Sequence, residues 1–128
     1  MGQSLILIVD DHAVIRDLLV AALSLHGYRV AQAADGQEAL VWLQQHAGQI
    51  DAILLDLDMP GMDGSTFLAQ AQARSLALPA IAVMTATNAP LSLPYPILRK
   101  PFQIKDILSV LHQLLSDIGK ASGKVESQ

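Results

Sequence analysis

The stretch that decides the fold is DAILLDLDMPGMDG, residues 51–64. A short apolar run leads directly to Asp56 and Asp58, and the chain then turns through proline and glycine. Unbroken apolar runs of this length are typical of strands buried on both faces of a parallel sheet. The acids that follow such a strand are either ordinary loop polarity or part of a functional site, and the rest of the chain must distinguish the two.

Working outward from this stretch, apolar runs alternate with segments of helical periodicity, a pattern that predicts βαβ units. The predicted strands are residues 4–11, 28–33, 51–56, 78–86 and 96–100, and the predicted helices are residues 12–26, 34–48, 64–75 and 104–118. We therefore predict an α/β fold, a doubly wound five-stranded parallel sheet with helices on both sides. Residues 1–118 form the predicted domain, and the small, polar residues 119–128 are predicted to be a flexible tail or a linker stub.

The composition excludes several classes of protein. With 128 residues, 52% of them hydrophobic, the chain suits one folded domain and not a disordered one. A net charge of −4 argues against direct nucleic-acid binding, which usually needs a basic patch. There is no cysteine, no basic start followed by a signal-type apolar segment, and no apolar run long enough for a membrane span. We therefore expect a cytoplasmic domain that does not contact the membrane.

Polar side chains follow four of the five predicted strands. Asp10 and Asp11 end the first, Asp56 the third, Thr85 the fourth and Lys100 the fifth. Each is unremarkable alone, since acids at strand ends are commonly exposed and threonine is common in strands. In a parallel sheet, however, the carboxyl ends of the strands meet at one edge, where ligands bind.

The residue types at this edge suit phosphoryl transfer. Clustered carboxylates repel one another unless they are protonated or bridged by a cation, and oxygen ligands favour Mg²⁺. A carboxylate held in this way can attack phosphorus, because aspartyl phosphates are an established covalent strategy. A lysine ammonium and a threonine hydroxyl can stabilise the charge on the transferring oxygens.

Four motifs in order, ILIVDDHAVIRDLL, ILLDLDMPGMDG, AVMTA and LRKPF, resemble the receiver domain of two-component response regulators, which are CheY-like. The resemblance spans residues 4–118 and implies a flavodoxin-like fold. It implies that Asp56 accepts a phosphoryl group from a histidine kinase or a phosphotransfer protein and that this changes an interaction with an output partner, which the sequence does not identify. A homodimer is also compatible with the resemblance.

The resemblance also implies a role for each site residue. Asp11, Asp56 and the backbone carbonyl of Asp58 would hold Mg²⁺ with help from Asp10, whereas Thr85 and Lys100 would contact the phosphoryl oxygens. Pro60, Gly61 and Gly64 would shape the loop after the third strand, and Asp63 would cap the following helix. The four histidines are interpreted as helix-end or surface residues.

Three features depart from the family pattern. The aromatic switch residue expected three positions before Lys100 is Ile97, and Tyr95 is the alternative, because strand alternation would point it the same way. The coupling of Thr85 to an aromatic ring is therefore in question. The family also uses the side chains at positions 58 and 87 to tune phosphoryl lifetime, and the sequence does not give the sign of that effect.

The third departure is the short, proline-rich segment between Thr85 and Lys100, about two helical turns shorter than in typical relatives. Pro90, Pro94 and Pro96 disfavour a helix there, so the fourth helix of the family is predicted to be shortened or absent. Two interpretations of its apolar side chains stay open. Leu91, Leu93 and Tyr95 form a contact surface for a partner, or they cover the core where the helix is missing.

Two other functions share part of this sequence pattern. ILLDLD also fits the D-x-D motif of haloacid-dehalogenase-type phosphohydrolases, but there the motif lies on the first strand, and this chain offers no substrate cap. A pseudo-receiver would keep the fold without being phosphorylated, which the complete set of pocket residues disfavours. We expect a signalling domain that catalyses its own phosphorylation and slow dephosphorylation and is not a turnover enzyme.

Overall fold

Five parallel strands form one sheet in the order β2-β1-β3-β4-β5. The computed structural model describes residues 3–126, and the side chains of residues 3–116. The strands are β1 (Leu5–Val9), β2 (Arg29–Ala33), β3 (Ala52–Asp56), β4 (Ala80–Thr85) and β5 (Ile97–Arg99). The helices are α1 (Ala13–Leu25), α2 (Gly36–Gln45), α3 (Gly64–Ala73) and α4 (Ile104–Glu126). The predicted doubly wound parallel sheet is confirmed.

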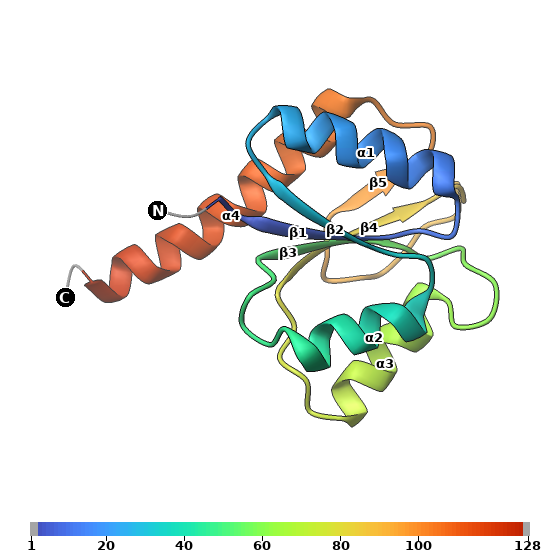
Figure 1. Ribbon diagram of the computed structural model, residues 1–128, viewed down its shortest axis with the longest axis horizontal. Coiled ribbons are helices and arrows are strands. Elements are labelled where there is room, and N and C mark those ends of the chain that lie inside the picture. The colour runs from blue at the N-terminus through green and yellow to red at the C-terminus, as the bar shows by residue number, and fades with distance from the viewer. Residues whose placement is uncertain (1–2, 127–128) are drawn as a thin grey trace.

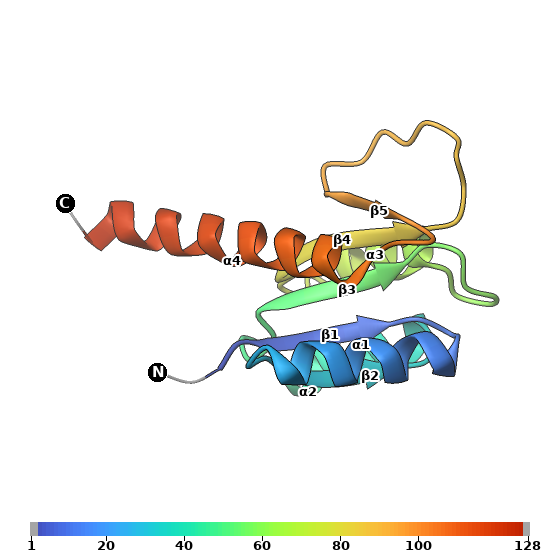
Figure 2. The same ribbon diagram turned by 90° about the horizontal axis from the view of Figure 1, so that it is seen from above.

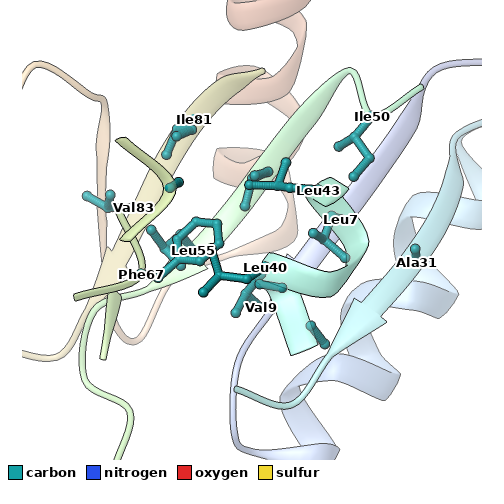
Figure 3. Close-up of a cluster of buried hydrophobic side chains, with 14 of the residues drawn as sticks. Leu7, Val9, Ala31, Leu40, Leu43, Ile50, Leu55, Phe67, Ile81 and Val83 are labelled. Carbon is teal, nitrogen blue, oxygen red and sulfur yellow. The ribbon is translucent and has the colours of Figure 1, made fainter. Parts of the chain in front are cut away.

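Helices cover both faces of the sheet because its central strands are apolar on both sides. α1 and α4 lie on one face, and α2 and α3 on the other (Figure 1). Alternate residues of β1 enter different clusters: Leu7 packs in the cluster under α2 and α3, and Ile8 in the cluster under α1 and α4. Figure 3 shows the first cluster, in which Phe67 and Leu40 from the helices meet Leu55 of β3. Burial on both faces explains the unbroken apolar runs in the sequence.

The register of the sheet aligns the strand ends that carry the polar residues. Val9 lies opposite Leu55, which places Asp10 beside the end of β3. Asp56 pairs with Met84, and Thr85 pairs with Arg99, the residue before Lys100. One edge of the sheet therefore gathers the side chains that the sequence analysis assigned to a site.

Between β4 and β5, the described residues 86–96 contain no helix, so the predicted loss of the fourth helix is confirmed. Figure 2 shows this segment as a long loop. Half-buried Leu91, Leu93 and Tyr95 alternate along it with exposed residues, and Leu93 and Tyr95 pack against the core cluster under α2 and α3. These contacts favour the interpretation that the loop covers the core.

The last helix is longer than predicted. The helix predicted from the sequence ends at Ile118, but α4 continues to Glu126. Helix propagation adds one hydrogen bond for each residue, so a helix nucleated on the core can continue into a polar segment. Residues 127 and 128 of the predicted tail lie outside the described residues, and a linker role for residues 119–128 stays a prediction. Within the described part of the chain, no helix is both long and apolar enough to cross a membrane.

Replacing Leu93 by alanine tests whether the loop covers the core. We expect Leu93→Ala to lower the free energy of unfolding by about 1–2 kcal/mol, less than for a fully buried leucine, because Leu93 is only half-buried. The exposed neighbour gives the control: Ser92→Ala should change stability by less than about 0.5 kcal/mol. Urea unfolding measures both variants. Equal stability of Leu93→Ala and the wild type would show that the loop contributes nothing to the core.

Candidate functional site

Three polar side chains are fully buried in the described part of the chain, and all three belong to the predicted site. They are Asp10, Asp56 and Thr85, each with no exposed surface. Burying a carboxylate is costly unless it is paired or hydrogen-bonded. Within the described residues, the protein therefore accepts the cost of burying polar side chains only at this edge of the sheet.

Lys100 joins two of these side chains. Its Nζ lies 3.2 Å from Asp10 Oδ2 and 3.3 Å from Asp56 Oδ2. The lysine side chain is itself 18% exposed, so its charge is mostly shielded from water. One ammonium thus faces two buried carboxylates, which leaves an excess of negative charge.

Asp10 is fixed by contacts from the start of α1. Its Oδ1 accepts a hydrogen bond from the backbone N–H of His12 at 2.8 Å and lies 3.1 Å from the His12 ring Nδ1. Arg16 donates from Nη1 to the backbone carbonyl of Asp10 at 2.6 Å. Both oxygens of the Asp10 side chain, and its carbonyl, therefore have defined positions.

The carboxylates that carry the remaining negative charge lie close enough together to bind a cation. Ligand atoms of Asp10, Asp11, His12 and Asp56 lie within 4.8 Å of one another. Asp11 Oδ1 is buried without a hydrogen-bond partner, although His12 Nδ1 lies 3.3 Å away. A buried carboxylate oxygen that accepts no hydrogen bond from the protein is available to bind a metal ion. The oxygen-rich set of ligands fits Mg²⁺.

His12 is the member of this group that the sequence analysis did not place in the site. It precedes α1 as its N-cap residue and its side chain is 62% exposed, so its interpretation as a helix-end surface residue agrees with the structure. Its ring nevertheless lies against Asp10 and Asp11. The signal available in the sequence was its position directly after two acids.

Asp58 makes contacts that the sequence analysis missed. Its backbone N–H donates to Asp56 Oδ1 at 2.9 Å. Its carboxylate accepts hydrogen bonds from Thr85 Oγ1, at 3.0 Å to Oδ2, and from the backbone N–H of Ala86 at 2.8 Å. The predicted role of its backbone carbonyl as a metal ligand stays a prediction, and the side chain is already engaged with β4.

The loop after β3 packs close to the site, with a glycine at its tightest contact and an aspartate that caps the next helix. Gly64 packs so tightly that a Cβ there would lie 2.8 Å from the backbone oxygen of Asp56. Asp63 caps α3 by accepting a hydrogen bond from the Thr66 N–H at 2.8 Å, as predicted. Gly61 has φ +73°, a conformation that favours glycine.

Two of the three candidate switch residues pack on the same side of the sheet. Tyr95 and Ile97 are both half-buried against the cluster under α2 and α3, as strand alternation suggested. The buried Thr85 hydroxyl is bound by Asp58 at the end of β4. The use of Thr85, Tyr95 or Ile97 as a switch stays a prediction.

Burial and charge shift two pKa values in this site. Burial raises the pKa of Asp56, and the nearby Asp10 carboxylate adds to this, against the opposing effects of the Asp58 N–H and Lys100. Burial alone would lower the pKa of Lys100, but the charges of Asp10 and Asp56 outweigh it and the pKa is raised. The protein groups of this site therefore favour the protonated lysine and disfavour the ionised form of Asp56.

The raised pKa of Asp56 predicts a pH-dependent cost to stability. Above the ordinary value of 3.8, the folded protein holds the Asp56 proton more tightly than the unfolded chain, so rising pH lowers the free energy of unfolding through this window. We expect Asp56→Asn, measured without metal, to be more stable than the wild type near about pH 7, with a gap that shrinks toward about pH 4. Urea unfolding across this range checks it, with exposed Asp17→Asn as the control. A gap that does not depend on pH would contradict the electrostatic explanation.

Comparisons with known proteins identify the family of this chain. The profile of the response regulator receiver domain family matches residues 6–94. The sensor kinase CckA of Brucella abortus is 32% identical over 89% of this chain, which spans 13% of that kinase. The response regulator MprA of Mycolicibacterium vanbaalenii is 33% identical over 95% of this chain, which spans 54% of it. The chemotaxis protein CheY4 of Vibrio cholerae superposes with a TM-score of 0.78 and 30% identity, covering 89% of this chain and all of that structure. The chain belongs to the response regulator receiver domain family of two-component signalling.

Proposed function

We propose that Asp56 is a phosphoacceptor that receives a phosphoryl group from a histidine kinase or a phosphotransfer protein. The observation that carries this proposal is the fully buried Asp56 carboxylate, bound at one oxygen by Lys100 and at the other by the Asp58 N–H. These two donors orient the nucleophile. The unpartnered Asp11 oxygen beside it supports a bound Mg²⁺.

The proposed metal ligands are the side chains of Asp10, Asp11 and Asp56 and the backbone carbonyl of Asp58. When bound, Mg²⁺ would neutralise charge on the carboxylates and on the transferring group. Charge neutralisation would offset the effect that now raises the pKa of Asp56, so the carboxylate would stay ionised as a nucleophile.

In the proposed reaction, an Asp56 side-chain oxygen attacks the phosphorus of the donor. A P–O bond forms to Asp56, the P–N bond of the donor phosphohistidine breaks, and its electron pair returns to the imidazole nitrogen. Lys100, already 3.3 Å from Asp56 Oδ2, supplies positive charge to the phosphoryl oxygens. In dephosphorylation, water attacks the phosphorus and releases inorganic phosphate with the free Asp56 carboxylate. The chain thus catalyses its own modification and is not a turnover enzyme.

The phosphohydrolase alternative fits the structure less well. In that class the second acid of D-x-D acts as a general acid, whereas here the Asp58 carboxylate accepts hydrogen bonds from Thr85 and Ala86. The motif also lies on β3, beside β1 in the sheet, and not on the first strand.

We propose that phosphorylation instead changes the binding of an output partner or of a second copy of the chain. The proposed location is the cytoplasm, where histidine kinases use ATP.

Labelling with acetyl phosphate tests the phosphoacceptor. With Mg²⁺, we expect one phosphoryl group for each chain, stable in acid and labile in alkali, and no label on Asp56→Asn because the nucleophile is gone. Mass spectrometry measures the label, and Asp17→Asn on α1 should label like the wild type. Failure of the folded wild type to label would favour the pseudo-receiver, and turnover of a small phosphomonoester would favour the phosphohydrolase.

Neutralising the Asp11 carboxylate tests the metal site. We expect Asp11→Asn to weaken Mg²⁺ binding by at least about tenfold, because a neutral amide replaces a charged ligand. The Mg²⁺-dependent rise in thermal stability reports the affinity. Asp17→Asn removes the same charge from an exposed position and should keep the wild-type response. Equal affinities of all three proteins would exclude Asp11 as a ligand.

A further inference from the structure

Two hydrogen-bond donors at the end of β4 converge on one carboxylate. Thr85 Oγ1 lies 3.0 Å from Asp58 Oδ2 and 3.2 Å from Oδ1, and the backbone N–H of Ala86 donates to Oδ2 at 2.8 Å. The Thr85 oxygen in turn accepts a hydrogen bond from the Thr87 N–H at 3.2 Å. This third bond directs the hydroxyl proton of Thr85 toward Asp58. Bonds of this kind to a charged acceptor are stronger than those between neutral groups.

The carboxylate that takes these donors is beside the proposed phosphoacceptor. The Asp58 N–H is bonded to Asp56 Oδ1, so the two residues are held together through the backbone. Asp58 is exposed, whereas Thr85 is fully buried. The side chain therefore caps a buried hydroxyl from the solvent side, and water can solvate the carboxylate when it leaves the hydroxyl.

A phosphoryl group on Asp56 would compete with the Asp58 carboxylate for these donors, because the Asp58 N–H is bonded to Asp56 itself. It brings negative charge and three acceptor oxygens to a site where each of these donors has one proton to give. The carboxylate and the phosphoryl group cannot both take the Thr85 proton and the Ala86 N–H. Two anions on the same donors would also repel each other.

We infer that the Asp58 carboxylate is a placeholder that occupies the phosphoryl-binding donors of Thr85 and Ala86 before phosphorylation and leaves them afterwards. This inference rests on the proposed phosphoacceptor function. Asp58 is thus a positioning residue that competes with the phosphoryl group. It also holds the Thr85 hydroxyl in place before phosphorylation, so Asp58 is the side chain that moves, and Thr85 exchanges one acceptor for another.

The first test uses the metal-free, unphosphorylated protein and the amide resonance of Ala86. In Asp58→Ala the Ala86 N–H loses its carboxylate acceptor. We expect its proton resonance to move upfield and its exchange with solvent to become faster, while amides in β1 and β3 keep their positions. An unchanged Ala86 amide would show that the placeholder contact does not exist in solution, and would overturn the inference whatever the site does with phosphate.

The second test measures binding of beryllofluoride, a phosphoryl analogue, at saturating Mg²⁺. We expect Asp58→Ala to bind it about five- to tenfold more tightly than the wild type, since no carboxylate has to be displaced. Asp58→Asn keeps one carbonyl acceptor for these donors, so its gain should be smaller. The control is Asp63→Asn, which removes a charge from the same loop but retains an N-cap residue, and it should bind like the wild type.

The outcomes separate the inference from the function on which it rests. Binding by the wild type with no gain in Asp58→Ala would overturn the placeholder and leave the phosphoacceptor intact. Equal gains in Asp58→Ala and Asp58→Asn would show simple charge repulsion and would also overturn it. If neither the wild type nor Asp58→Ala binds beryllofluoride, the phosphoacceptor function fails and the placeholder fails with it. Binding of beryllofluoride by Asp58→Ala but not by the wild type would support the inference, because the Asp58 carboxylate would then block the donors completely.

Discussion

The ammonium of Lys100 between two buried carboxylates is the interaction on which the site depends. Asp10 follows β1, Asp56 ends β3 and Lys100 follows β5, so one cation links residues from both sides of β4 at the edge of the sheet. Removing one member of a buried ion pair typically costs about 3–5 kcal/mol, because an uncompensated charge is left behind. This lysine, together with the backbone N–H groups of His12 and Asp58, offsets the cost of burying the acids at the ends of the apolar strands.

The same constraint gives the site its chemistry. One ammonium cannot neutralise three nearby carboxylates. Burial, with the Asp10 carboxylate adding to it, raises the pKa of Asp56, and one buried oxygen of Asp11 has no hydrogen bond. A divalent cation would reduce the excess of negative charge in the site, and a phosphoryl group added later would increase it. The acidic excess therefore links metal binding to the reactivity proposed for Asp56, and both to the position of Lys100.

Much of this arrangement was predictable because it follows from periodicity and strand direction. Apolar runs predicted the five strands, parallel pairing placed Asp10, Asp56, Thr85 and Lys100 at one edge, and three prolines predicted the missing helix. The hydrogen bonds of Asp58 could not be predicted, because side-chain direction in a loop depends on donors supplied by another strand. The end of α4 was also missed, because hydrophobic periodicity fades in a polar segment before the helix does.

The loop that replaces a helix also affects how the sheet ends. β5 is an edge strand of only three residues, and Pro94 and Pro96 precede it. Proline has no N–H to donate, and short edge strands offer few free groups to another chain. An exposed sheet edge is ordinarily a template for intermolecular strand pairing and aggregation. In this protein the segment that covers the core also makes that edge a poor template, so the domain is protected there without a helix to shield it.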